Sequence, residues 1–312
     1  MLPQKANKRY MVSFVASFPA LLIPFGAVAF DGAAVPVVIE APSGHVQNIG
    51  FAEPPKKRHS ITVPIPPPAK GVKLPKIYGP DDPSRPLVVI DAGHGGHDPG
   101  AINREKGYRE KDLTLALAIA LKDRLVAEGR VRVALTREDD RYLILQERSD
   151  IARAMGAGLF ISLHADAAES PQAHGATIYT LSETASDREA ARLAARENKA
   201  DVINGINIGE QDDTVSSILI DLSQRESMER SSDFVRLLYR EASPYVRFRS
   251  TWHRFASLVV LKAPDMPSIL FEAGYITSAR DAALLGGKPG RKKIAEGLAR
   301  AIEIYFIRQS TP

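Results

Sequence analysis

The sequence predicts a single α/β domain over residues 87–308, with a twisted, mostly parallel or mixed sheet of about six strands flanked by helices. Three observations indicate this fold class. Short apolar runs rich in β-branched residues alternate with helical patterns over about 220 residues, which is typical of one mostly parallel or mixed sheet. The hydrophobic content of 44% is ordinary for a globular protein. The chain also contains no internal repeat.

The expected elements follow from these runs in chain order. The run Leu87–Ile90 ends in a glycine-rich turn, as a buried parallel strand often does. Apolar runs predict strands at 87–90, 131–135, 159–163, 176–180, 257–261 and 268–271. Helical periodicity predicts helices at 111–127, 144–155, 187–202, 214–238 and 282–306.

The N-terminus has the pattern of a cleaved signal peptide over residues 1–29. Lys5, Lys8 and Arg9 precede an apolar run from Met11 to Ala29, which ends in the small-residue pattern Ala-Val-Ala. The alternative is an uncleaved membrane anchor, because the run is just long enough to span a bilayer. The prolines within the run and its A-x-A ending favour cleavage, so we expect an exported protein that meets the membrane only through this leader.

Residues 30–86 are expected to form a proline-rich tether. Ten of the 22 prolines lie between Pro54 and Pro86, and such a segment favours extended conformations. Removal of the three basic residues of the leader lowers the formal charge from +4 to +1. The mature chain therefore gives no charge argument for nucleic acid as a partner.

Several histidines and carboxylates follow predicted strands, where open α/β sheets build their sites. The chain has no cysteine, so a metal would have to be held by histidine and carboxylate. His94 follows the first strand in a glycine-rich turn, and His164 ends another strand; each has an aspartate nearby. The turn lacks the Walker and G-x-G-x-x-G patterns, which argues against phosphate binding.

Two carboxylates complete the candidate site. A catalytic zinc site needs a third ligand, and Glu110, just before the helix at 111–127, is well placed to supply it. Glu272 closes the apolar run before it, where a carboxylate is costly unless it is paired or functional. It could serve as a general base or form a buried salt bridge, and spacing alone leaves both readings open.

With these histidines and carboxylates in this order, the sequence resembles the zinc-dependent N-acetylmuramoyl-L-alanine amidases of the amidase-3 family. The resemblance runs from Leu87 to about Ile307 and rests on five blocks in order: Val89–Ala101 with its Asp-Ala-Gly-His-Gly-Gly, Glu110–Asp112, Leu135–Arg137 with Glu147–Arg148, Ser162–Asp166 and Ala263–Tyr275.

The resemblance implies one zinc ion per chain, held by His94, Glu110 and His164, with Glu272 as the catalytic carboxylate. It implies hydrolysis of the amide between N-acetylmuramic acid and L-alanine of peptidoglycan in the periplasm, during daughter-cell separation and wall remodelling. His97 and His253 are candidates for the substrate groove.

Residues 184–238 resemble the insertion of regulated members, which holds a helix over the zinc cleft until a degenerate LytM-type activator displaces it. We expect Glu189, or next Glu183, to fill the open zinc position in the resting state. The apolar stripe Ile218, Leu219 and Leu222 could instead simply pack on the domain. Two other functions remain open: a catalytically dead wall-binding protein, and a zinc peptidase that cuts within the stem peptide.

Overall fold

The computed structural model describes residues 74–168, 170, 172–202 and 214–310, with the backbone alone at 201, 202 and 214–221. These residues belong to one compact unit, Ile65–Pro312. The expected signal peptide and most of the expected tether lie outside the described residues, as do the side chains of Ile218 and Leu219. Among the described residues, no helix combines the length and the apolar character needed to cross a bilayer.

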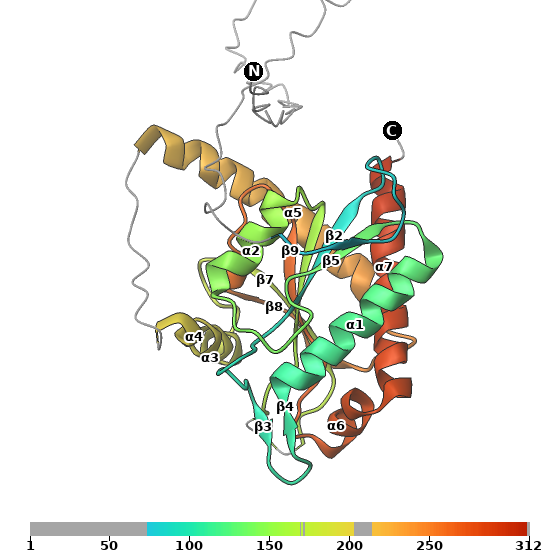
Figure 1. The fold of residues 1–312 in the computed structure, drawn as a ribbon. Helices are drawn as coiled ribbons and strands as arrows, with labels where there is room; N and C mark the ends of the chain where they lie inside the picture. The colour runs from blue at the N-terminus through green and yellow to red at the C-terminus, as the bar shows by residue number, and fades with distance from the viewer. Residues whose placement is uncertain (1–73, 169, 171, 203–213, 311–312) are drawn as a thin grey trace, which may run out of the picture. The chain divides into compact units, whose positions relative to one another are not determined.

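The centre of this unit is a seven-stranded mixed sheet in the order β1-β5-β2-β6-β9-β7-β8 (Figure 1). Its strands are β1 (Ile77–Tyr78), β2 (Leu87–Ala92), β5 (Arg132–Leu135), β6 (Leu159–His164), β7 (Ala176–Leu181), β8 (Phe248–Ala256) and β9 (Ser268–Glu272). β5, β2, β6 and β9 are parallel, whereas β7 is antiparallel to β9. The prediction of a mostly parallel or mixed α/β sheet is confirmed.

Helices cover both faces of the sheet. They are α1 (Glu110–Glu128), α2 (Leu145–Ala154), α3 (Arg188–Glu197), α4 (Lys199–Val202), α5 (Thr214–Ala242), α6 (Ala279–Gly286) and α7 (Lys288–Ser310). One core packs α1, α5 and α7 against side chains such as Ile90, Ile161 and Phe271. The other packs α2 and α3 against the opposite side chains, such as Val89 and Phe160. Because alternate residues of each strand point to opposite faces, these strands are apolar throughout.

Three local expectations need correction. Ser257–Leu261 is not a strand: Val259–Leu261 is a short 3₁₀ helix, and the strand β8 lies just before it. The helix expected at 282–306 is two helices, α6 and α7, divided at Gly287. The sheet has a seventh strand, β1, which pairs with β5. Because β1 lies within the segment expected as tether, the folded domain begins before residue 87.

A small hairpin of β3 (Ile102–Asn103) and β4 (Tyr108–Arg109) leads into α1. It places Glu110 at the first residue of that helix, beside the carboxyl ends of β2 and β6.

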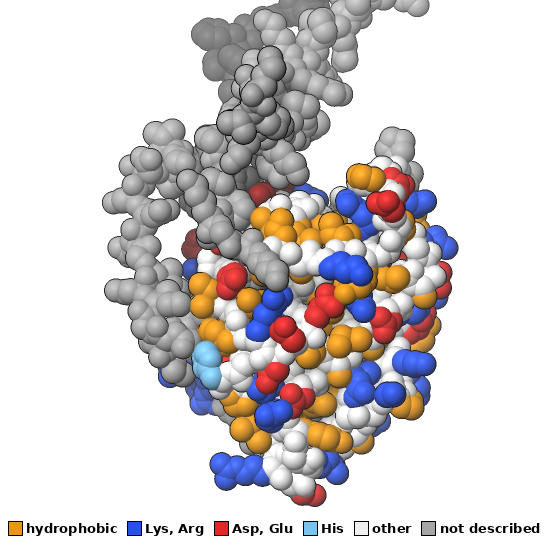
Figure 2. All heavy atoms as spheres, in the orientation of Figure 1, with side chains coloured by type: hydrophobic (Ala, Val, Ile, Leu, Met, Phe, Trp, Pro, Cys, Tyr) orange, Lys and Arg blue, Asp and Glu red, His pale blue; other side chains and the backbone are white. Residues whose placement is uncertain are grey.

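On the face shown in Figure 2, acidic and basic side chains are interspersed, with hydrophobic side chains between them.

Candidate metal centre

The carboxyl ends of three adjacent parallel strands carry the candidate site. His94 lies two residues after β2, His164 is the last residue of β6, and Glu272 is the last residue of β9. His164 and Glu272 are direct partners in the β6–β9 register. The sheet therefore fixes the spacing of these side chains, at the edge where parallel sheets build their sites.

The turn after β2 has a backbone that brings His94 close to His164. His94 has a φ of 63°, a left-handed conformation that is uncommon for a residue with a side chain. A Cβ atom at Gly93 would lie 2.4 Å from Nε2 of His164, so the rings can approach only because this residue is glycine. The two ring centroids are 4.9 Å apart.

Buried arginines hold this turn from beneath. Arg137 donates hydrogen bonds to the carbonyl oxygens of Ala92 and Gly93, and Arg148 donates to that of His94. Asp91 accepts from Arg148 at 3.0 Å and also from Thr136 and Ser162. Although burial opposes it, the charge of Arg148 and the two hydroxyl groups keep the pKa of Asp91 below its usual value.

Glu110 joins the two histidines from the start of α1. Its Oε2 lies 3.2 Å from Nε2 of His94, and its Oε1 lies 3.2 Å from Nδ1 of His164. The same oxygens accept hydrogen bonds from the backbone N–H groups of Ala101 and Ala165. The other nitrogen of His94, Nδ1, lies 2.8 Å from Asp98, a contact that orients the ring.

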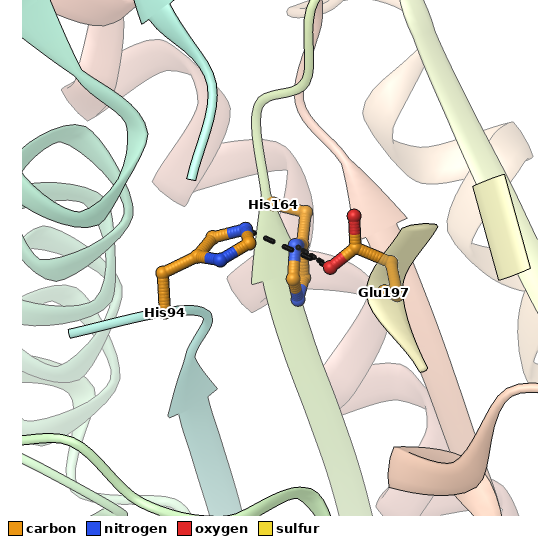
Figure 3. A group of neighbouring side chains, drawn as sticks. All are labelled: His94, His164 and Glu197. Carbon is orange, nitrogen blue, oxygen red and sulfur yellow. Dashed lines mark ion pairs between the residues drawn. The ribbon is translucent and has the colours of Figure 1, made fainter. Parts of the chain in front are cut away.

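Glu197, at the end of α3, is a fourth residue of this cluster (Figure 3). Its Oε2 lies 3.6 Å from Nε2 of His94 and 3.5 Å from Nδ1 of His164. The sequence analysis did not predict Glu197, although its place in an apolar helical pattern could have indicated that it is buried. Ala190, Leu193, Ala194 and Glu197 follow the i, i+3, i+4, i+7 spacing, and all four are buried.

These residues fit a divalent cation. Nε2 of His94 and Nδ1 of His164 are buried, and neither makes a hydrogen bond of acceptable geometry. Ligand atoms of His94, His164 and Glu197 lie within 4.8 Å of one another. Burial lowers the pKa of His94, but the charges of Glu110 and Glu197 outweigh it and raise that pKa well above the usual value. Nitrogen and carboxylate donors in a site rich in negative charge are typical of zinc.

Glu272 has the environment of a proton acceptor. Its Oε2 accepts a hydrogen bond from the backbone N–H of Asp166, while its buried Oε1 has no hydrogen-bond partner. Burial raises the pKa of Glu272 well above the usual range, and the charges of Asp166, Glu110 and Glu197 add to the effect. Glu272 lines a cavity of about 160 Å³ that α3 covers. These contacts favour the general-base reading over the buried salt bridge.

Asp166 connects this cavity to α3. Burial and the charge of Glu110 raise its pKa to about 7, although Arg196 opposes the shift. The Arg196 guanidinium of α3 pairs with the Asp166 carboxylate and lies 3.5 Å from Glu197. The helix is thus fixed to the wall of the site near its C-terminal end.

The remaining candidates lie apart from the two histidines. Glu189 pairs with Arg249 and Arg254 at the far end of α3, and Glu183 is exposed on a loop. His97 is exposed and packs on Tyr142, with ring centroids 4.2 Å apart. His253 lies on β8, where Nε2 is 3.1 Å from Oγ1 of Thr180, and burial lowers its pKa. Neither histidine lines the cavity beside Glu272.

Comparisons with known proteins identify the family of this chain. The family profile described as N-acetylmuramoyl-L-alanine amidase, Amidase_3, matches residues 88–304. N-acetylmuramoyl-L-alanine amidase AmiA of Salmonella typhimurium is 38% identical over 224 residues, covering 72% of this chain and 77% of that protein. AmiA of Escherichia coli K12 is 37% identical, covering 70% and 76%.

Solved structures show the same fold. The amidase AmiC2 of Nostoc punctiforme is 27% identical with a TM-score of 0.51, and the match covers 72% of this chain and 98% of that one. The catalytic domain of the amidase CwlV from Paenibacillus polymyxa is 25% identical with a TM-score of 0.51, covering 71% and 98%. Since the family profile matches more than half of the chain, and both AmiA relatives are more than 30% identical over about three quarters of their own length, the chain belongs to the Amidase_3 family of N-acetylmuramoyl-L-alanine amidases.

Proposed function

We propose that this enzyme is a zinc-dependent hydrolase that cuts the amide between N-acetylmuramic acid and L-alanine of peptidoglycan. The observation that carries the proposal is the pair of buried imidazole nitrogens of His94 and His164, which lie among carboxylates without a hydrogen bond, next to Glu272. His94, Glu110 and His164 would hold one zinc ion. Bound zinc would supply Lewis-acid polarisation of the scissile carbonyl and a more acidic water.

The chain's own residues supply the proton transfers. Glu272, with its raised pKa and its free Oε1 beside the cavity, takes the proton of the attacking water. It then passes that proton to the leaving amine of L-alanine, as a general base that becomes a general acid. The backbone N–H of Asp166 donates a hydrogen bond to Oε2 and so fixes the orientation of the carboxylate.

We also propose that the described state is autoinhibited, with Glu197 as the blocking residue. Three protein ligands leave zinc an open position for water or substrate, and a carboxylate acting as a fourth ligand would fill it. Glu197 is buried beside both histidines. An activator of the degenerate LytM type would displace α3 and shift the equilibrium to the open state.

The setting of the activity rests on the N-terminal sequence. The basic and apolar leader over residues 1–29 supports export to the periplasm, where peptidoglycan is the substrate. A role in daughter-cell separation and wall remodelling follows from the resemblance to regulated amidases.

The test uses the chain from Phe30, carrying Glu197→Ala so that autoinhibition does not hide activity, and incubated with peptidoglycan. We expect mass spectrometry to find intact stem peptides that begin with L-alanine. Chelation should abolish their release, and Glu272→Ala should lower it by about 100- to 10,000-fold, the usual range for a general base. Zinc content measured on the Glu272→Ala protein should be unchanged. Cuts inside the peptide would instead indicate a peptidase, and no cut would indicate a wall-binding protein.

A further inference from the structure

In the cavity beside Glu272, three side chains of the sheet side surround the carboxylate of Glu189. Tyr275 donates a hydrogen bond to Oε1 of Glu189 at 2.9 Å, and Arg254 lies 2.9 Å from Oε2. Arg249 pairs with the same Oε1 and also contacts the Tyr275 hydroxyl. Two guanidinium groups and a phenol thus surround one carboxylate.

This cluster is built into the rigid part of the fold. Arg249 and Arg254 belong to β8, and Tyr275 follows β9 by three residues. Arg254 and Tyr275 are each only 5% exposed. Asp281 accepts hydrogen bonds from the backbone N–H groups of Tyr275 and Gly175, which fixes the turn that carries the phenol. The cationic groups would therefore stay in place if α3 moved away.

The two acidic residues of α3 lie in two separate pockets: Glu197 lines the small pocket that His94 and His164 also line, and Glu189 lines the cavity beside Glu272. Glu197 lies at the histidines, and Glu189 lies at the arginines, eight residues earlier in the chain. Eight helical residues span about 12 Å. An extended peptide covers about 3.4 Å per residue, so the same span corresponds to roughly three residues beyond the scissile amide. Glu189, Arg249, Tyr275 and Glu272 all line the same cavity.

We infer that Arg249 and Tyr275, supported by Arg254, bind a free carboxylate of the stem peptide within its first three residues once α3 is displaced. Before that displacement, Glu189 occupies the site in place of the substrate carboxylate, while Glu197 blocks the proposed zinc position. A buried arginine left without an anion is costly, so a substrate carboxylate that replaces Glu189 compensates for its departure. This inference rests on the proposed function, because it assigns a specificity site to that reaction.

The experiment uses the chain from Phe30 with Glu189→Ala and Glu197→Ala, which we call the released chain. Its substrates are a muramoyl-peptide with free stem carboxylates and the same compound with those carboxylates converted to carboxamides. We expect KM to be about tenfold or more higher for the carboxamide, with a similar kcat, since bonds between charged partners are the strong ones. Arg249→Gln in the released chain should raise KM for the acid to the carboxamide level and change the carboxamide value little.

Two further variants separate binding from structure. Tyr275→Phe keeps the ring and should cause a smaller loss, again only with the acid. Arg247→Gln is the matched control, because Arg247 is exposed just before β8 and does not line the cavity. If Arg249→Gln activates the chain that retains both glutamates but has no effect in the released chain, Arg249 only fastens the helix and the inference is wrong.

A binding measurement distinguishes failure of this inference from failure of the proposed reaction. Calorimetry with the released chain carrying Glu272→Ala compares the two muramoyl-peptides without turnover. Acid-selective binding that Arg249→Gln removes, together with no cleavage of the lactyl–alanine amide by the released chain that keeps Glu272, would keep the carboxylate site and reject the reaction. Normal cleavage with equal KM values for acid and carboxamide would keep the reaction and reject the carboxylate site.

Discussion

The approach of His94 to His164 depends on a single hydrogen atom at Gly93. Since a Cβ there would lie within 3 Å of three atoms of the His164 imidazole, any larger residue must push that ring out of position. The β2–β6 pairing leaves the backbone little room to yield, because Gly93 also donates a hydrogen bond to the carbonyl of Leu163.

We therefore expect Gly93→Ala to lose zinc and activity while retaining the fold. Misplacement of a reacting group by about 1 Å can cost about 100-fold in rate. Metal analysis, amidase assays and far-ultraviolet circular dichroism check the three parts. Gly287→Ala is the control, because its Cβ would meet nothing closer than 3.3 Å. Full zinc content in Gly93→Ala would contradict this account of the turn.

The sequence allowed the prediction of site residues whose positions are set by strands. It did not allow the prediction of Glu197, whose position depends on how a helix packs. His94, His164 and Glu272 follow or end strands, so parallel pairing alone gathers them. Glu110 came from its place at the start of a helix and from the family resemblance. Glu197 depends on which face of α3 meets the cleft, and Glu189 lies one position away from the buried stripe.

At the scale of elements, α3 is held at both ends by charged side chains. Asp187 accepts a hydrogen bond from the Ala190 N–H as the N-terminal cap and also pairs with Arg254. Arg196 pairs with Asp166 near the other end. Between these contacts the helix buries only three small or medium apolar side chains, Ala190, Leu193 and Ala194. Such an element can separate from the sheet at a modest cost in free energy.

Substitution of Glu197, the proposed blocking residue, should therefore raise basal activity. We expect Glu197→Gln to increase amidase activity by about tenfold or more without activator, because the neutral amide binds a cation far less well than a carboxylate. Glu183→Ala is the matched comparison, since Glu183 is exposed and does not belong to the cluster of His94, His164 and Glu197. Activation by Glu183→Ala with none by Glu197→Gln would reverse the assignment.

Each element that the sequence prediction misplaced has a local residue pattern that apolar periodicity does not resolve. The run Leu258–Leu261 is apolar and buried, and a short buried run does not distinguish a strand from a helical turn by periodicity. β8 was missed because its polar residues Arg249, Ser250 and Thr251 interrupt any apolar pattern. In α6 and α7, Gly287 and Pro289 interrupt a pattern whose apolar spacing otherwise continues.

At the scale of the whole molecule, the folded unit includes more than the segment that the family profile matches. Arg132 donates hydrogen bonds to the carbonyl oxygens of Pro83 and Arg85, and the Tyr78 hydroxyl donates to Glu138 at 2.6 Å. β1 also pairs along β5. We expected these residues to belong to the tether because of the proline content of the segment, which gives no indication of the two-residue strand β1.

Two truncations test this boundary. A chain that begins at Leu74 should unfold within about 2 °C of the chain that begins at Phe30, since the proline-rich segment supplies no independent core. A chain that begins at Leu87 should unfold at least about 4 °C lower, because the loss of β1 and Tyr78 removes on the order of 1–2 kcal/mol of contacts. Calorimetry checks both; equal unfolding temperatures for all three chains would place the boundary at Leu87.

β8 is the last strand of the sheet, and its sequence has a consequence beyond catalysis. Edge strands offer unpaired backbone groups to other chains, and charged side chains on them discourage aggregation. In the described state Arg249 and Arg254 of this strand are paired with Glu189 of α3, and its exposed side chains are Ser250, Thr251 and Phe255. We expect displacement of α3 to leave two unpaired positive charges along this edge, where they would keep neighbouring copies of the sheet apart.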